Sequence, residues 1–127
     1  MKRVIVAGSR YYDDKEVLYS ILDKVVAELG DNIEILSGNC RGADRLGEQY
    51  AVEHGITVKK FPAHWMRYGN RAGYIRNKAM AEYAGEENGY LVAFLLGESK
   101  GTKMMIDLAK KHGLKICIIK NGIICKG

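Results

Sequence analysis

Three short segments of the sequence place glycine beside a cationic side chain. They are residues 8–10, 37–44 and 97–102, and each follows an apolar run and leads into a helix-like pattern. Glycine lets a backbone turn sharply and approach a ligand, and the free N–H groups at a helix start attract anions. Arginine adds a planar set of donors that fits a phosphate group. These segments therefore predict a site for a phosphate-containing ligand.

Most candidate ligand-binding residues come from these segments, and one is a tryptophan. They are Gly8, Ser9, Arg10, Ser37, Gly38, Arg41, Gly42, Asp44, Trp65, Gly97, Ser99, Lys100, Gly101 and Thr102. Trp65 could stack on a base or anchor its loop to the core, and both interpretations stay open. Glycines that only serve tight turns explain any single segment equally well, but three such segments favour a shared ligand.

Two carboxyl side chains, those of Asp44 and Glu98, lie within or beside the glycine segments and are candidates for catalysis. Asp44 could equally be a partner of a helix dipole, and Glu98 could be a solvated loop residue. Either carboxylate could instead accept hydrogen bonds from ribose hydroxyl groups. The identity of any catalytic residue therefore stays open at this point.

Cysteine and histidine residues do not form a metal-binding pattern. The three cysteines and three histidines lack metal-ligand spacing, so we predict no bound metal and no cofactor. Cys40 precedes Arg41 near a helix start, a setting that favours a reactive thiolate. Because no histidine is placed by the sequence to act as its base, we interpret Cys40 as a small loop residue.

The two standard phosphate-binding fingerprints are missing. No Gly-x-Gly-x-x-Gly follows an apolar run, and no Gly-x-x-x-x-Gly-Lys-Ser/Thr occurs. The chain is therefore neither an ordinary dehydrogenase nor a P-loop ATPase.

Apolar runs and helix-like stripes alternate along the chain. Strands are predicted at residues 3–7, 33–36, 57–61, 90–96, 114–119 and 123–125, and helices at residues 17–29, 43–51, 72–83 and 102–109. Residues 63–71 are predicted to form a polar and aromatic loop. Residues 90–96 are nearly all apolar, as expected for a strand that is covered on both faces.

This alternation predicts an α/β fold over residues 1–127. We expect a single Rossmann-like, doubly wound and mainly parallel sheet with helices on both faces. Asn121-Gly122 between two apolar runs predicts a C-terminal hairpin that adds an antiparallel edge strand. Ligands bind such sheets at the carboxyl ends of the strands, and the three glycine segments should converge there.

Composition limits the possible partners. The chain has neither a long apolar span nor a signal-like start, so we expect no membrane association and a cytoplasmic location. Its 20 basic and 15 acidic residues give a net charge of +5, which favours an anionic partner. That partner would be a phosphorylated small molecule or, less favoured, a nucleic acid.

These motifs together resemble the YspA-related branch of the SLOG superfamily, from residue 3 to about residue 118. The similarity is carried by Gly8-Ser-Arg10, Ser37-Gly-x-x-x-Gly-Ala-Asp44, His64-Trp65, Ala72-Gly-x-x-Arg-Asn77 with Met80, and Gly97-x-x-x-Gly-Thr102. The resemblance implies a SLOG domain that binds a nucleotide or nucleotide-derived ligand, such as AMP, ADP-ribose or NAD, in a Rossmann-like pocket. It adds Arg76 and Asn77 to the candidate ligand-binding residues. It also suggests a homodimer.

The SLOG superfamily includes the LOG phosphoribohydrolases and the DNA-processing protein DprA. In LOG enzymes, an arginine on a helix and a glutamate three residues after a Gly-Thr pair support cleavage of the N-glycosidic bond of a nucleoside 5′-monophosphate. Arg76 matches the arginine and is by this resemblance a third candidate for catalysis. The glutamate position falls on Met105, which cannot act as an acid or base. The resemblance thus favours a binding or sensing domain over a LOG-type hydrolase, with DprA-like binding of single-stranded nucleic acid as a third hypothesis.

Overall fold

The structure is a computed structural model that describes residues 1–120 and 123–126. The strands are β1 (Lys2–Gly8), β2 (Ile33–Ser37), β3 (Thr57–Lys60), β4 (Tyr90–Leu95), β5 (Lys115–Lys120) and β6 (Ile123–Lys126). The helices are α1 (Lys15–Leu29), α2 (Ala43–Glu53), α3 (Trp65–Tyr68), α4 (Ala72–Gly85) and α5 (Lys100–Lys111), with a 3-10 turn η1 (Gly69–Arg71). Within the described part of the chain, no helix is long and apolar enough to cross a membrane.

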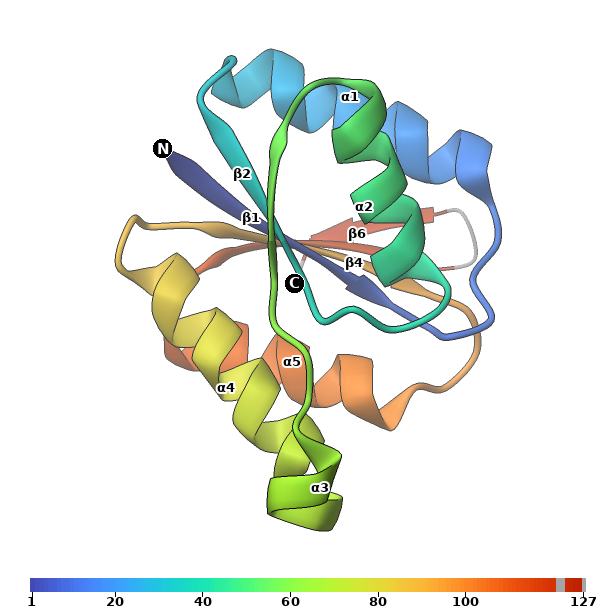
Figure 1. Cartoon of the computed structure of the whole chain (residues 1–127). Coiled ribbons are helices and arrows are strands. Elements are labelled where there is room, and N and C mark those ends of the chain that lie inside the picture. The colour runs from blue at the N-terminus through green and yellow to red at the C-terminus, as the bar shows by residue number, and fades with distance from the viewer. Residues whose placement is uncertain (121–122, 127) are drawn as a thin grey trace.

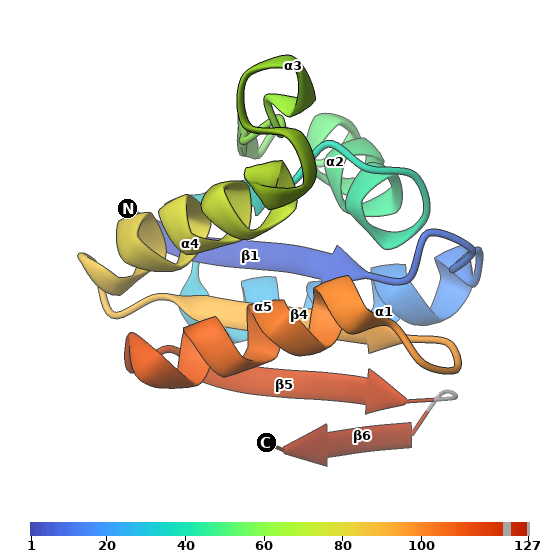
Figure 2. The same cartoon turned by 90° about the horizontal axis from the view of Figure 1, so that it is seen from below.

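The strands form one sheet in the order β3-β2-β1-β4-β5-β6. Strands β1 to β5 are parallel, and β6 runs antiparallel to β5 (Figure 2). The prediction of a mainly parallel sheet with an antiparallel edge strand is therefore confirmed. The turn predicted at Asn121-Gly122 lies outside the described residues.

Helices cover both faces of the sheet (Figure 1). Val4 and Val6 of β1 belong to the core cluster on the side of α1 and α2, whereas Ile5 and Ala7 belong to the cluster on the side of α4 and α5. Successive side chains of a strand point to opposite faces. A strand that is apolar at every position therefore suits this central place, as the sequence predicted for residues 90–96.

Two of the differences between the predicted and the observed segments concern the surroundings of the carboxyl ends of the strands. Helix α5 begins at Lys100 rather than at Thr102, because the Ser99 side chain accepts a hydrogen bond from the Thr102 N–H and is thus the N-cap. The segment 63–71, predicted as a loop, contains α3 and η1. Helix α3 projects from the body of the molecule near the start of α4 (Figures 1 and 2).

Gly42 makes the entry into α2 possible. Its φ of +79° lies in the region that L side chains rarely adopt, and a Cβ there would lie 2.2 Å from the Ser9 carbonyl oxygen. The Ala43 N–H donates to the same oxygen at 3.3 Å. The start of α2 is therefore packed directly against the loop that follows β1.

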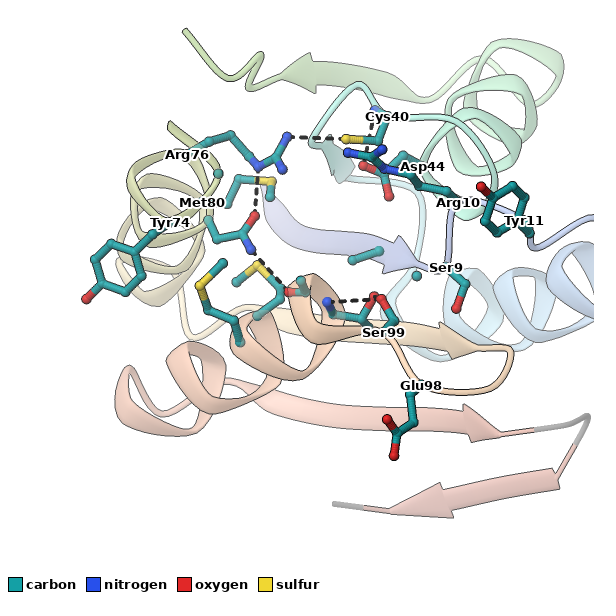
Figure 3. Close-up of a pocket in the computed structure, with 18 of the residues that line it drawn as sticks. Ser9, Arg10, Tyr11, Cys40, Asp44, Tyr74, Arg76, Met80, Glu98 and Ser99 are labelled. Carbon is teal, nitrogen blue, oxygen red and sulfur yellow. Dashed lines mark hydrogen bonds between the residues drawn. The ribbon is translucent and has the colours of Figure 1, made fainter. Parts of the chain in front are cut away.

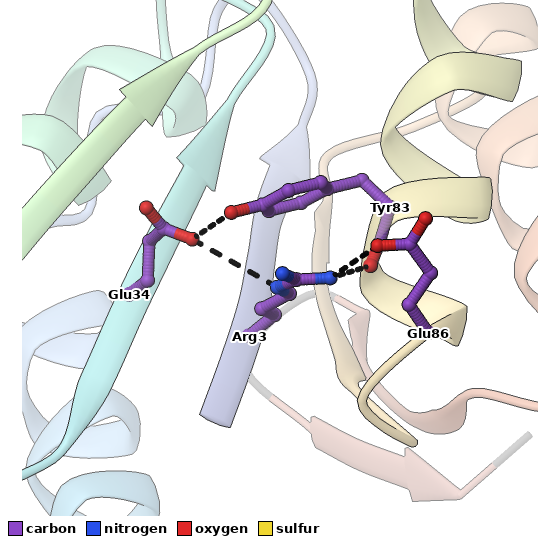
Figure 4. Close-up of polar contacts among 4 residues, drawn as sticks. All are labelled: Arg3, Glu34, Tyr83 and Glu86. Carbon is purple, nitrogen blue, oxygen red and sulfur yellow. Dashed lines mark hydrogen bonds and ion pairs between the residues drawn. The ribbon is translucent and has the colours of Figure 1, made fainter. Parts of the chain in front are cut away.

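Polar contacts hold the C-terminal part of α4 against the amino ends of β1 and β2 (Figure 4). The Arg3 guanidinium donates to the Tyr83 carbonyl oxygen at 2.6 Å and to the Glu86 carboxylate at 2.9 Å. It also lies 3.5 Å from the centroid of the Tyr83 ring, while the Tyr83 hydroxyl donates to Glu34 at 2.7 Å. These contacts lie at the opposite edge of the sheet from the carboxyl ends of the strands, and they fix the position of α4.

Candidate functional site

A pocket of about 520 Å³ lies at the carboxyl ends of the parallel strands (Figure 3). The chain leaves β1 toward β2 on one side and leaves β4 toward β5 on the other, so the loops after β1 and β4 diverge. Doubly wound proteins bind their ligands where two such loops diverge, at the switch point of the sheet. The pocket is lined by Ala7, Gly8, Ser9, Arg10, Tyr11, Cys40, Asp44, Trp65, Asn70, Gly73, Tyr74, Arg76, Asn77, Met80, Leu96, Glu98, Ser99, Gly101, Thr102, Met104 and Met105.

The floor of the pocket is apolar. Met80 of α4 and Met105 of α5 are almost completely buried, and both belong to the core cluster that also contains Ala7. Met104 of the same helix is half-buried and packs against this cluster. Met105, the position that a LOG enzyme would fill with glutamate, is thus both a core residue and part of the floor. Thioether side chains offer a polarizable surface to a flat ring.

Ser9 joins the loops that follow β1 and β4. Its buried Oγ accepts a hydrogen bond from the Leu96 N–H at 3.0 Å and lies 3.3 Å from the Leu96 carbonyl oxygen, to which it donates. The Ser9 N–H donates to the Phe94 carbonyl oxygen at 3.0 Å. The loops after β1 and β4 are therefore held together by a side chain whose hydrogen-bonding capacity is used within the protein.

Arg76 is held in place by three acceptors. Its Nη1 donates to the Gly38 carbonyl oxygen at 2.5 Å and lies 3.6 Å from the Cys40 Sγ, and its Nε donates to the Asn77 Oδ1 at 2.7 Å. Its Nη2 has no hydrogen-bond partner among the described residues. The guanidinium is thus fixed at the wall of the pocket, and its Nη2 is available to donate to a ligand.

Asn77 connects this arginine to the start of α5. The side chain is 5% exposed, and its Nδ2 donates to the Gly101 carbonyl oxygen at 3.3 Å. Because Oδ1 accepts from Arg76 at the same time, the amide bridges α4 and the first turn of α5. Asn77 therefore orients Arg76 and spaces the two helices along one side of the pocket.

Asp44 is a buried carboxyl group in the first turn of α2. Only 6% of the residue is exposed, and Oδ2 accepts a hydrogen bond from the Cys40 N–H at 3.3 Å. Burial raises its pKa to about 7, with a smaller increase from the Glu48 charge, although the Cys40 and Gly38 N–H groups and the Arg76 guanidinium act in the opposite direction. A carboxyl group of this kind changes its protonation state near neutral pH.

Gly38 separates Asp44 from Arg76. A Cβ at this position would lie 2.8 Å from the Arg76 Nη1 and 2.8 Å from the Asp44 Oδ2. The absence of a side chain therefore lets the cation and the carboxyl group lie on either side of the same stretch of backbone. Figure 3 shows both groups on one side of the end of β1, with Ser99 on the other side.

The start of α5 forms that other side. The Ser99 Oγ accepts from the Thr102 N–H at 3.4 Å and lies 2.8 Å from the Thr102 hydroxyl oxygen. The remaining N–H groups of the first helical turn have no acceptor within the helix and carry the positive end of its dipole. Gly101 leaves this turn open, since a Cβ there would meet no atom within 4 Å.

The pocket brings together most, but not all, of the residues proposed from the sequence. Ten of the proposed ligand-binding residues line it: Gly8, Ser9, Arg10, Asp44, Trp65, Arg76, Asn77, Ser99, Gly101 and Thr102. Six do not contribute to its wall, namely Ser37, Gly38, Arg41, Gly42, Gly97 and Lys100. The Ser37 hydroxyl instead donates to Glu48, and the Arg41 and Lys100 side chains are exposed.

Glu98 lines the rim, but its side chain is exposed and points away from Arg76 and Asp44 (Figure 3). Of the two acids proposed for catalysis, Asp44 is therefore the one that faces the centre of the pocket. Arg10 extends from the loop after β1 toward the same end of the pocket (Figure 3).

Sequence reasoning left Gly73, Tyr74, Met80, Met104 and Met105 out of the site. On α4, Gly73 precedes Arg76 and Asn77 by three and four residues, and Met80 follows them by four and three. Helical periodicity could therefore have identified Gly73 and Met80 from the Arg-Asn pair. In the loop after β1, Tyr12 is buried against Phe94, whereas Tyr11 is exposed and lines the pocket.

Comparison with known proteins shows similarities in sequence and in structure. A family model described as "YspA, cpYpsA-related SLOG family" matches residues 2–68. The Gene 61 protein of Mycobacterium phage D29 is 29% identical over 121 residues, which cover 91% of this chain and 94% of the phage protein. The X-ray structure of DNA processing protein A (DprA) from Streptococcus pneumoniae matches with a TM-score of 0.57 at 14% identity, over 92% of this chain. The chain spans about half of the DprA chain, 49%, so this likeness concerns the fold alone.

Proposed function

Because the chain belongs to the YspA, cpYpsA-related SLOG family, we propose that its pocket binds a nucleotide or a nucleotide-derived phosphorylated ligand such as AMP, ADP-ribose or NAD. The observation that carries this proposal is the fixed guanidinium of Arg76 at the wall of a pocket at the switch point of the sheet. A volume of about 520 Å³ suits a ligand of this size.

The two kinds of surface in the pocket match the two parts of such a ligand. Arg76, Arg10 and the first turn of α5 offer donors and positive charge for phosphate oxygens. The methionine floor and the exposed rings of Trp65 and Tyr74 at the rim offer apolar surface for a base. A nucleotide therefore uses both surfaces at once, whereas inorganic phosphate uses only the first.

Thermal unfolding with AMP, ADP-ribose and NAD tests the proposal, with the wild type compared with Arg76→Ala. A ligand at about one hundred times its dissociation constant adds roughly 2.7 kcal/mol to the free energy of unfolding. We expect one of these compounds to stabilise the wild type and to lose most of this effect in Arg76→Ala. Arg45→Ala is the matched control, because Arg45 is exposed on α2 and does not line the pocket.

Equal stabilisation of the wild type and Arg76→Ala would refute binding in this pocket. Stabilisation of neither protein by any of the compounds would refute it as well. The wild type and Asp44→Ala are also assayed for free base released from AMP. Release that depends on Asp44 would make the protein a hydrolase of the LOG type, with Asp44 in place of the glutamate.

A neighbouring hollow favours single-stranded nucleic acid as a second candidate ligand. This hollow of about 370 Å³ is lined by residues that include Lys59, Lys60, Phe61, His64 and Tyr68, and it shares Arg76 with the pocket. Cations beside aromatic rings suit a chain of phosphates and bases. If single-stranded nucleic acid occupied both cavities, the affinity of the protein for oligonucleotides would depend steeply on the salt concentration.

Replacing Lys60 distinguishes this second candidate from the first. If a strand is bound, Lys60→Ala should reduce the slope of log affinity against log salt by about one, while Lys110→Ala on the far part of α5 should leave it unchanged. Fluorescence anisotropy with a labelled oligonucleotide measures this slope. An unchanged slope in Lys60→Ala would show that bound single-stranded nucleic acid does not pass through the hollow.

A further inference from the structure

We infer that Asp44 accepts hydrogen bonds from the ribose hydroxyl groups of the ligand, and that the pocket thereby selects ribonucleotides over deoxyribonucleotides. This inference rests on the proposed function and adds the class of sugar to it. Asp44 lines the pocket although only 6% of the residue is exposed, so its free surface faces the cavity. A buried carboxylate requires hydrogen-bond donors, and sugar hydroxyl groups supply them.

The protein supplies only part of what this carboxyl group can accept. Oδ2 receives the Cys40 N–H at 3.3 Å, and the Gly38 backbone also lies against the same oxygen. A carboxylate has about four acceptor positions, so positions remain for a ligand. Arg76 does not occupy them, because its Nη1 and Nε are bound to the Gly38 carbonyl oxygen and to Asn77, and its Nη2 makes no hydrogen bond to a described residue.

The position of Asp44 within the pocket also separates sugar from phosphate. The carboxyl group lies on the α2 side of the end of β1, and the first turn of α5 lies on the other side (Figure 3). A phosphate next to a carboxylate would be repelled, whereas the N–H groups of α5 attract it. The ligand is therefore oriented with its anionic end toward the first turn of α5 and Arg76, which the Asn77 amide connects, and with its neutral hydroxyl groups toward Asp44.

Binding of AMP, 2′-deoxy-AMP and 3′-deoxy-AMP to the wild type and to Asp44→Asn tests this inference by calorimetry. A hydrogen bond to a charged group is worth a factor of about ten or more in affinity. We expect the wild type to bind AMP at least about tenfold more tightly than one of the deoxy analogues. In Asp44→Asn the affinity for AMP should fall to that for the analogue, while the affinity for the analogue changes little.

Binding of the analogue to Asp44→Asn also shows that the variant is folded. Asp107→Asn is the matched control, because Asp107 is an exposed carboxylate on α5 outside the pocket, and it should keep the preference for AMP. Equal binding of all three nucleotides by the wild type would overturn the inference and leave the proposed function intact. If none of the three binds, the inference falls, and the result with ADP-ribose and NAD decides whether the proposed function falls with it.

A measurement on the wild type alone gives a second test. The groups that face Asp44 are Arg76 from α4, Glu48 from its own helix, and the Cys40 and Gly38 N–H groups from the loop before α2, and Arg10 extends toward the same end of the pocket. The pKa of Asp44 is raised to about 7, so the carboxylate form becomes dominant as the pH rises through neutrality. The ratio of AMP affinity to deoxy-AMP affinity should therefore increase from about pH 6 to about pH 8. Titration of the ligand phosphate affects both nucleotides equally and cancels in this ratio, so a constant ratio contradicts a role for Asp44.

Discussion

Asp44 is a residue whose charge opposes folding near neutral pH. Its pKa of about 7 in the folded chain lies above the ordinary value of 3.8, so between these values the native state keeps a proton that the unfolded chain has lost. Stability from this group is therefore present below about pH 4, falls as the pH rises to about 7, and changes no further above that.

Asp44→Asn should remove this pH dependence. Between about pH 4 and about pH 7, the free energy of unfolding of the variant should rise relative to the wild type by on the order of a few kcal/mol. Urea denaturation at a series of pH values measures the difference. A difference that is constant with pH would mean that the buried carboxyl group titrates normally.

Gly38 is a residue whose lack of a side chain positions two others. In Gly38→Ala, the new Cβ would meet the Arg76 Nη1 and the Asp44 Oδ2, both at 2.8 Å. The end of a long arginine side chain moves more readily than an aspartate at a helix start, so Arg76 should be displaced. The affinity for the stabilising nucleotide should then fall by about tenfold or more, the loss expected when a charge-assisted hydrogen bond is removed. Unchanged affinity in a variant with a normal circular dichroism spectrum would show that Arg76 does not bind the ligand.

The sequence could propose some residues of the pocket wall and not others. Ser99 and Gly101 were proposed because their types and local spacing suit phosphate binding, and Arg76 and Asn77 because they match a motif of the SLOG superfamily; all four line the pocket. Arg41 and Lys100 were proposed on the first of these grounds, yet they are exposed and do not line the pocket, because the direction of a side chain in a loop depends on contacts that local spacing does not encode. The methionine floor was missed as part of the site, since a buried apolar residue has the same sequence signal whether or not a cavity lies above it.

At the scale of single elements, α4 has the most constrained position. Its first half carries Arg76 and Asn77, and its last turn is held by Arg3 and Glu34 at the other edge of the sheet. Tyr83→Phe removes the hydroxyl that donates to the 13% exposed Glu34 side chain at 2.7 Å.

This substitution should destabilise the protein by about 1–2 kcal/mol, because a charged acceptor loses its hydrogen bond. Denaturant titration of the wild type and of Tyr83→Phe measures the loss. The ring and its contact with Arg3 are retained, so nucleotide affinity should change little. A large loss of affinity would instead show that this distant contact controls the position of Arg76.

Most elements were predictable, while their limits and one helix were not. The stripe of α1 and the uniform apolar run of β4 have the periodicities of a half-buried helix and a buried strand, and both elements form there. Helix α3 gave no such signal, because it has four residues and none of them is buried. The start of α5 was placed two residues late, since Ser99 and Thr102 are both residues that favour a helix start.

At the scale of the whole molecule, the α/β class and the parallel sheet followed from alternation alone. The strand order did not, because alternation is compatible with several orders of a doubly wound sheet. The return of the chain from β3 to the far side of β1 is fixed by the pairing of β1 with β4, for example Val6 with Val92. That return is also what creates the switch point where the pocket lies.

The pocket is built from loops after β1, β2 and β4 and from α4, so a bound ligand should stabilise the molecule as one unit. With a saturating nucleotide, the unfolding transitions seen by far-UV circular dichroism and by Trp65 fluorescence should shift together, by roughly 2.7 kcal/mol at one hundred times the dissociation constant. Measurement of both signals in the same samples tests this expectation. A shift confined to the fluorescence of Trp65 would mean that the ligand orders only the segment around α3.

Ser9 and Leu96 hold the loops after β1 and β4 together in the ligand-free protein. An incoming ligand does not have to order these loops, so it loses little conformational entropy of the chain on association. The association rate should then be governed by diffusion and by attraction between an anion and a positively charged protein. Differences in affinity among related ligands should consequently appear in how long each one stays bound.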